Sequence, residues 1–282
     1  MTLSQVIFPY DLHSHSTASD GALSPTELVR LAVEAGVRHL ALTDHDSVAG
    51  IQEAAEAAQD HPIQLIPGVE ISVTWEKRCF HVLGLNIDPN SESLTKGLRR
   101  LQQLRRERAE RMDVHLKKHG ISGALEAVQS MAGEGMITRT HFGRFLIAQG
   151  YAKDMPDVFD KFLVRGKPGY VATQWADLEE ALEWIQQASG IAVLAHPLRY
   201  KLTGAWLRRF LTAFRSSGGL GIEVVCGNST PVQIEACADY ARRYRLMGSV
   251  GSDFHDPAFP WIELGKLHPL PQGVTPVWEG WQ

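Results

Sequence analysis

The sequence predicts an α/β fold, in which a barrel-like domain of strands and helices is interrupted by a helical segment. Two observations lead to this prediction. Short apolar runs alternate with helical patterns from residue 7 to about residue 90, and the same alternation resumes after about residue 168. This rhythm is typical of βα units around a largely parallel sheet. Between the two blocks, residues 92–166 lack strand alternation and have helical periodicity throughout.

The first block contains four apolar runs that we predict to be strands. They cover residues 6–12, 39–43, 64–73 and 81–87. Between the first two runs, Ser24-Pro25-Thr26-Glu27 is a capping box with proline at the first helical position, which predicts the start of a helix. Gly36 predicts where that helix ends.

The second block repeats the pattern. Helices are predicted at residues 177–189, 205–214 and 231–244, and strands at the segments IAVLAHP, GIEVV and SVGSDFH. If these strands join those of the first block in one barrel, their carboxyl ends meet at a single face.

The middle segment begins with one long predicted helix. An apolar stripe runs along it at Leu94, Leu98, Leu101, Leu104 and Met112, and arginines cover its other faces. We interpret these arginines as a solvated face, with RNA contact as the alternative. Shorter helices are predicted near 123–132, 140–149 and 156–164. We therefore expect a small helical domain, residues 92–166, inserted into a barrel domain formed by residues 1–91 and 167–282.

Composition limits the classes of function. The 282 residues are 44% hydrophobic and 21% charged, which is ordinary for a globular enzyme with a sizeable core. The net charge of -4 argues against a protein that coats nucleic acid nonspecifically, because such proteins are strongly basic. Any contact with nucleic acid should be local.

The compartment is predicted from the cysteines and the N-terminus. Cys79, Cys226 and Cys237 form no CxxC pair and are odd in number, which favours a reduced interior over a disulfide framework. The start of the chain lacks a basic region, a long apolar run and a cleavage site, and no run elsewhere approaches a membrane span. We expect a cytoplasmic protein without a membrane contact or an obligate protein partner.

Histidines and carboxylates gather where the predicted strands end. His13 and His15 end the first run, and residues two apart on a strand project to the same side. One such pair is more often structural than metal-binding, but the pattern recurs at the ends of several strands. The further candidates are Asp20, His45, Glu70, His81, His196, Asp253 and His255. Mixed imidazole and carboxylate ligands favour Mn, Fe or Zn over Ca or Mg. The sequence therefore predicts a metal cluster.

The motifs DLHSHSTASDG, TDHD, GVEIS, HVLG, AHP and GSDFH, in this order, resemble those of the PHP (polymerase and histidinol phosphatase) superfamily. The resemblance implies a distorted (β/α)7 barrel with two or three divalent transition metal ions, of which manganese is the expected metal and iron or zinc the alternatives. It also implies three sets of ligands: His13, His15, Glu70 and Asp253; Glu70 with His81 and His196; and Asp20, His45 and His255. Many members have histidine where this chain has Asp20.

Within that superfamily, ITRTHFGRFLIAQGYAKD and RGKPGYV are similar to the branch of the 3′,5′-nucleoside bisphosphate phosphatases and the 5′-3′ exoribonuclease RNase AM. The resemblance implies hydrolysis of the 3′-phosphate of pAp to give AMP, 5′-3′ cleavage of short single-stranded RNA, or both. A phosphatase for another small phosphomonoester, such as histidinol phosphate, and a non-catalytic PHP module are the alternatives.

The predicted chemistry is in-line attack on phosphorus by a metal-bridged hydroxide. His196 and His255 are candidates for the catalytic proton donor if either is free of metal. The non-reacting phosphate needs cations, and Arg139, Arg144, Arg199 and Lys167 are candidates, with surface solubility as their other interpretation. His141 either bonds a phosphate or caps a helix, and Asn228 either contacts a sugar or base or forms a turn.

Overall fold

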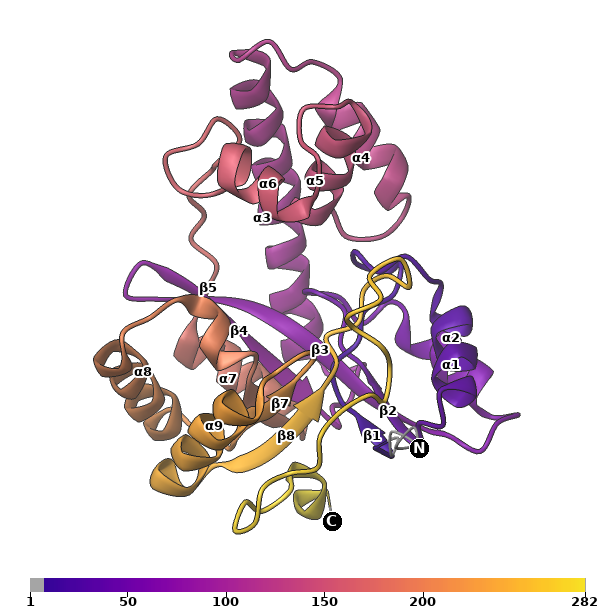
Figure 1. The fold of residues 1–282 in the computed structure, drawn as a ribbon, viewed down its shortest axis with the longest axis vertical. Helices are drawn as coiled ribbons and strands as arrows, with labels where there is room; N and C mark the ends of the chain where they lie inside the picture. Colours follow the sequence, from indigo (N-terminus) through magenta and orange to yellow (C-terminus); the bar gives the residue numbers. More distant parts are fainter. Residues whose placement is uncertain (1–7, 282) are drawn as a thin grey trace, which may run out of the picture.

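A computed structural model describes residues 8–281, and its centre is a nearly closed barrel-shaped sheet (Figure 1). Seven strands lie side by side in the order β1 (Tyr10–Asp11), β2 (His39–Leu42), β3 (Gln64–Trp75), β4 (Arg78–Leu85), β6 (Ile191–Leu194), β7 (Gly221–Cys226) and β8 (Met247–Gly251). The two-residue strand β5 (Ala176–Asp177) pairs with β3. The start of the first predicted run, residues 6–7, lies outside the described residues.

The barrel closes where the chain leaves β1 and β8. The N–H of Leu12 donates to the carbonyl of Val250 at 3.0 Å, and the N–H of Asp253 donates to the carbonyl of His13 at 2.8 Å. Closure therefore brings residues from the two ends of the chain into direct contact. The predicted α/β barrel is confirmed.

The direction of β4 corrects one expectation. β1, β2 and β3 are parallel, as are β6, β7 and β8, but β4 is antiparallel to both of its neighbours. The rhythm of βα units does not extend to β3 and β4, which follow each other directly and form a hairpin. Its two-residue turn, Glu76 and Lys77, has both φ angles positive, at 44° and 62°, which matches the twist of the flanking strands.

Helices pack around the outside of the barrel (Figure 1). They are α1 (Pro25–Glu34), α2 (Ile51–Ala58), α7 (Leu178–Gln187), α8 (Gly204–Ser216) and α9 (Pro231–Tyr244). The predicted capping box is present at α1, where Oγ of Ser24 accepts from the N–H of Glu27 and the Glu27 carboxylate accepts from the N–H of Ser24. The main apolar core lies between these helices and the sheet.

Between β4 and β5 the chain forms only helices. They are α3 (Glu92–Lys117), α4 (Ala124–Ala132), α5 (Arg139–Ala148) and α6 (Met155–Val158), and a π-helical turn, Phe159–Leu163, follows. Figure 1 shows them above the barrel, with α3 connecting the two. Met112, Phe142 and Leu163 belong to a second apolar core, which supports our proposal that residues 92–166 are a separate domain.

The long helix α3 belongs to both parts of the molecule. Leu94, Leu98 and Leu101, in its first three turns, pack into the core of the barrel, whereas Ala109, Met112 and the turn that follows pack into the second core. A continuous helix thus connects the two cores rigidly.

Neither α3, with its many charges, nor any other helix within residues 8–281 is both long and apolar enough to cross a lipid bilayer.

Candidate metal centre and the adjoining cavity

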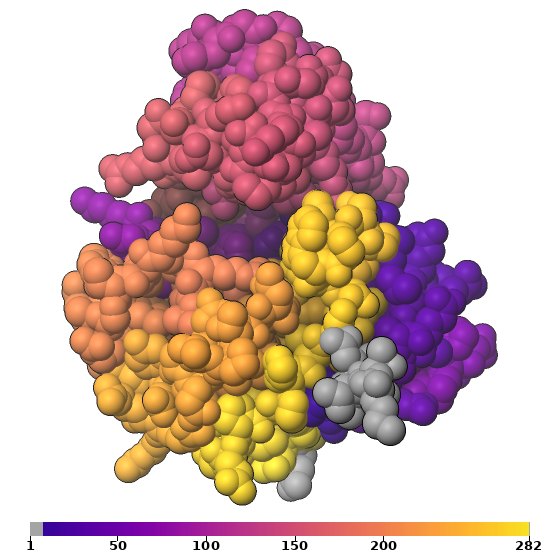
Figure 2. Space-filling view, viewed as in Figure 1, coloured from indigo at the N-terminus to yellow at the C-terminus, as the bar shows by residue number. Residues whose placement is uncertain are grey.

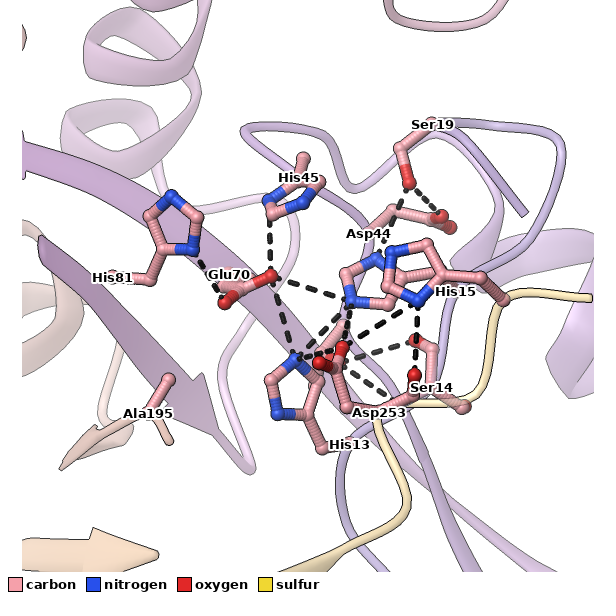
Figure 3. Close-up of polar contacts among 12 residues, drawn as sticks. His13, Ser14, His15, Ser19, Asp44, His45, Glu70, His81, Ala195 and Asp253 are labelled. Carbon is pink, nitrogen blue, oxygen red and sulfur yellow. Dashed lines mark hydrogen bonds and ion pairs between the residues drawn. The ribbon is translucent and has the colours of Figure 1, made fainter. Parts of the chain in front are cut away.

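The predicted ligands meet at one edge of the barrel (Figure 3). His13 and His15 follow β1, His45 follows β2, and Asp253 follows β8. These residues lie at one edge because the carboxyl ends of parallel strands point the same way. His81 comes from the beginning of β4. It reaches the same edge only because β4 is antiparallel, and it pairs in register with Ser72, two residues after Glu70 on β3.

The most deeply buried group contains His13, His15, Glu70 and Asp253, with one ligand atom of each within 4.8 Å of the others. Nε2 of His13 lies 3.2 Å from Nε2 of His15 and 3.4 Å from Oε2 of Glu70. Nε2 of His15 lies 3.2 Å from Oδ1 of Asp253. Two imidazole nitrogens and two carboxylates thus converge on one point, which is an arrangement able to hold a metal ion.

Two further groups share residues with the first. One contains His45, Glu70 and His81, and the other contains His15, Asp20, His45 and His255. These differ in three respects from the sets that the resemblance implied. His15 joins the group around Asp20. His45 joins the group around Glu70, with Nδ1 2.9 Å from Oε2. His196 belongs to no group, although its Nε2 lies 3.0 Å from Oε1 of Glu70.

Unpaired buried atoms show that the cluster fits metal ions. Oε2 of Glu70, Nδ1 of His45 and Nδ1 of His196 are buried without a hydrogen-bond partner among the described residues. His45 and Glu70 are close enough to bond, yet their geometry is not that of a hydrogen bond. A buried polar atom left unpaired typically costs about 1–3 kcal/mol. Divalent ions held by Glu70 and His45 would remove that cost for these two residues.

Charge in the cluster keeps its carboxylates ionised. Burial alone would raise the pKa of Glu70, but His45, His81 and His13 hold it well below its usual range. The pKa of Asp253 is likewise low, since His13 and Arg199 outweigh burial. Burial lowers the pKa of His45 to about 4, so this imidazole is neutral and offers a lone pair near pH 7.

Glu223, on β7, is a residue of the site that the sequence did not reveal. Nδ1 of His13 donates to its Oε1 at 2.9 Å, and the N–H of His196 donates to its Oε2 at 2.6 Å. Glu223 is fully buried. The available signal was a single carboxylate within the apolar run GIEVV, because a buried charge in a strand requires partners.

The neighbouring carboxylates have structural roles. Asp44 accepts from the N–H and the hydroxyl of Ser16 and from the hydroxyl of Ser19, at 2.6–2.8 Å, and so holds the loop that carries Asp20. Asp46 accepts from Nε of Arg105 at 2.7 Å. This ion pair is buried and attaches α3 to the edge of the barrel at which the predicted ligands meet, which we call the metal edge.

A cavity of about 460 Å³ lies between the metal edge and the helical segment; Figure 2 shows a hollow between these two parts. Asp20, His45 and His81 form its floor. Its other walls carry the cations Lys77, Arg78, Arg105, Arg108 and Arg139 and the aromatic residues Phe159, Tyr170 and Trp175. We call it the inner cavity. Its volume is in the range of small-molecule sites.

Arg108 and Arg139 are two cations of the inner cavity that no carboxylate of the described residues compensates. Neither forms an ion pair within the described part of the chain, and Nε of Arg108 is buried without a hydrogen-bond partner. Burial lowers the pKa of Arg108 to about 9, with repulsion from Arg139 and Arg105 adding to the effect. Our interpretation of the arginines of this helix as solvated was wrong for Arg105 and Arg108, which face inward. Two such guanidinium groups favour an anion.

The predicted phosphate binders lie in different places. Arg139 lines the inner cavity. Nη2 of Arg144 donates to the carbonyl of Asp20 at 3.1 Å, and Arg199 forms an ion pair with Asp253, so both support the ligands. Asn228 lies beside Arg199 in a smaller hollow of about 90 Å³.

Lys167 and His141 lie away from the inner cavity. Lys167 is exposed and lines a separate hollow with His115 and His119. Nδ1 of His141 accepts from the N–H of Thr138 at 3.1 Å, which is the capping alternative that the sequence left open. Thr138 in turn donates its hydroxyl to Asp20 at 2.7 Å, so this cap fixes the start of α5 next to the metal edge.

The barrel, its clustered ligands and the cationic cavity define a metal-dependent phosphoesterase. The chain belongs to the PHP domain family, whose sequence profile matches residues 11–193. It is 46% identical to the 5′-3′ exoribonuclease Rnm of Escherichia coli over 97% of this chain and 94% of that protein. It is 44% identical to the 3′,5′-nucleoside bisphosphate phosphatase of Chromobacterium violaceum over 95% of this chain and 94% of that one.

A solved structure is also similar. An amidohydrolase from Chromobacterium violaceum, with bound sulfate and no metal, superposes with a TM-score of 0.92 at 43% identity. The alignment covers 96% of this chain and 94% of that one. The likeness therefore includes both the barrel and the helical segment.

Proposed function

We propose that this enzyme hydrolyses the 3′-phosphate of 3′,5′-nucleoside bisphosphates and also releases mononucleotides from the 5′ end of short RNA. The two reactions share one requirement, namely a terminal 5′-phosphate bound at a fixed distance from the phosphorus that is attacked. The observation that carries the proposal is the pair Arg108 and Arg139, which face the inner cavity without a carboxylate partner among the described residues. Relatives named for each reaction support it.

The three ligand groups described above would hold the divalent metal ions that this reaction needs. We propose manganese, with iron or zinc as alternatives, since the ligands mix imidazole and carboxylate. When bound, such ions would lower the pKa of a coordinated water toward about 7 and neutralise charge on the phosphoryl oxygens. Arg108 and Arg139 would bind the 5′-phosphate, and Tyr170 or Phe159 would stack on the base.

We assign different roles to the two histidines that were predicted as proton donors. His255 belongs to the group around Asp20 and is assigned as a ligand. His196 stands outside the three groups, and we propose its Nε2, which lies 3.0 Å from Oε1 of Glu70, as the proton donor to the leaving oxygen. The three free cysteines fit a reducing cytoplasm, which we propose as the compartment.

A substrate panel tests the proposal. The manganese-loaded protein should release phosphate from pAp and mononucleotides from 5′-phosphorylated RNA, with kcat/KM at least about tenfold higher than for histidinol phosphate. Asp253→Asn should abolish both activities, because it removes a ligand. A preference for histidinol phosphate would favour a different phosphatase, and no turnover of any substrate at saturating metal would indicate a non-catalytic module.

A further inference from the structure

A second cavity opens from the inner one. It also has a volume of about 460 Å³, and we call it the outer cavity. The two share Lys77, Arg78, Cys79 and Tyr170 in their walls, so they adjoin at the β3–β4 hairpin, and we call them together the groove. Figure 2 shows the tip of the β3–β4 hairpin projecting where this groove reaches the surface, between the helical segment and α8. The metal ligands line only the inner part of the groove.

The outer cavity has an excess of positive charge. Lys77 and Arg78 are on the hairpin, and Arg165 is on the segment that returns from the helices. All three are exposed, and none forms an ion pair within residues 8–281. The carboxylate in its wall, Glu76, is already paired with Arg209 of α8. The three free cations therefore face the cavity without a compensating charge from Glu76.

An aromatic surface accompanies these cations. Trp206, at the start of α8, is partly exposed and lies with its ring centroid 4.6 Å from the guanidinium of Arg78 and 4.8 Å from that of Arg209. Trp75 packs edge-on against it, which fixes the orientation of the ring. Cations and aromatic rings along a groove are the combination that binds single-stranded nucleic acid, and here the Trp206 ring holds the guanidinium groups of Arg78 and Arg209 beside the outer cavity.

The hairpin holds its two cations firmly at the entrance to the outer cavity. Trp75 and Arg78 are the last pair of the β3–β4 ladder, and the two residues between them are in the left-handed conformation of a tight turn. A flexible loop would lose more entropy on binding. The preformed turn therefore favours an extended ligand that passes over it.

We propose that the outer cavity binds the nucleotides of a single-stranded RNA that lie 3′ of the cleaved bond. This inference rests on the proposed function. A nucleoside bisphosphate ends at the phosphate that is attacked, so the inner cavity is sufficient for it. An RNA continues beyond that phosphate and needs a path out, and the outer cavity is the cationic, aromatic continuation of the groove.

Substitutions confined to the outer cavity test this proposal. Arg165→Glu and Trp206→Ala change residues that do not line the inner cavity. Each should lower kcat/KM for a short 5′-phosphorylated RNA by about tenfold or more, since one stacked base or phosphate contact contributes that much. Each should leave kcat/KM for pAp within about twofold, since pAp does not reach these residues. Arg215→Glu, an exposed change of the same charge at the far end of α8, is the control.

Binding separates failure of this inference from failure of the proposed function. Anisotropy of a fluorescent 5′-phosphorylated RNA in the manganese-loaded protein should show affinity that rises with RNA length in the unaltered protein and in Arg215→Glu, but not in Arg165→Glu. Trp206 also packs on Trp75, so its replacement removes a packing contact. If Trp206→Ala unfolds, the result for the surface variant Arg165→Glu is used alone. Equal losses of kcat/KM for pAp and RNA would overturn the inference. Unchanged RNA binding in Arg165→Glu would overturn it even if neither substrate is turned over.

Discussion

Glu223 and His13 are 210 positions apart in the sequence, yet Nδ1 of His13 donates to the Glu223 carboxylate at 2.9 Å. This bond places the proton of the imidazole on Nδ1, so the lone pair of Nε2 points toward His15, Glu70 and Asp253. The other carboxylate oxygen accepts the N–H of His196. One buried side chain thus orients two histidines of the cluster.

Replacement of Glu223 by Gln should weaken metal binding. Two N–H groups donate to Glu223, whereas an amide has only one oxygen, so its NH2 group must face one of the two donors. Loss of such a partner typically lowers metal affinity by about 10–100-fold. Chelator competition with manganese measures this, and activity should return at saturating metal. Glu235→Gln, an exposed change on α9, is the control. Unchanged affinity would exclude this role.

Asp20→Asn should remove one metal ion per chain. Asp20 is the carboxylate of the group with His45 and His255, and it takes no part in the other two groups. The amide retains an acceptor for the hydroxyl of Thr138, so the loop should keep its structure. Elemental analysis after dialysis should give one ion fewer than in the control Asp256→Asn. Equal metal content in the two variants would contradict our assignment of a third site.

Arg108→Met should weaken binding of the 5′-phosphate selectively. Hydrogen bonds to a charged group contribute about 1.5–3 kcal/mol, which corresponds to an increase in KM for pAp of roughly 10–100-fold. The KM for 3′-AMP, which lacks the 5′-phosphate, should change by less than about twofold. Arg111→Met, an exposed change on the same helix, should affect neither substrate. Equal effects of Arg108→Met on both substrates would mean that this arginine does not bind the 5′-phosphate.

The buried cap His141 should make stability depend on pH. Burial lowers its pKa from 6.5 to about 4, with Arg144 adding to the effect and Asp20 opposing it. The unfolded chain therefore binds this proton more readily than the folded one. The contribution of His141 to the free energy of unfolding is fully present above pH 6.5. It falls as the pH drops toward about 4, by at most about 1.4 kcal/mol per pH unit.

His141→Gln isolates this contribution. Glutamine can keep the capping box with Thr138 through its side-chain oxygen but does not titrate. Urea unfolding should give similar free energies for the two proteins near neutral pH and a progressively more stable variant as the pH falls through the window. Because other groups titrate equally in both proteins, only the difference counts. A difference that is constant with pH would show that His141 is not responsible.

The ligands could be predicted because their signal is local. His13 and His15 are two apart at the end of the first predicted strand, and the period of a strand predicts that they lie on one side. Glu223 could not be matched to His13 in this way, since only closure of the barrel brings β7 next to the residues that follow β1. Within β7 itself, Glu223 looks like one charged residue in an apolar run.

Strand direction was missed for a related reason. Hydrophobic alternation indicates that a strand exists but not which way it runs, and Glu76-Lys77 lacks the Asn-Gly or Asp-Gly signal of a tight turn. The burial of Arg105 had a usable signal. It lies four residues after Leu101 and four before Ala109, both of which are buried, so helical periodicity puts it on the packed face.

The dependence of turnover on bound metal tests our central claim most directly. Metal-free protein would be titrated with manganese while bound metal and pAp hydrolysis are measured on the same samples. We predict no turnover without metal and a rise in activity as the ions around Glu70 bind, together with a loss of response in Asp253→Asn. Full activity in the metal-free protein, or metal binding without any gain in phosphoester hydrolysis, would contradict the account.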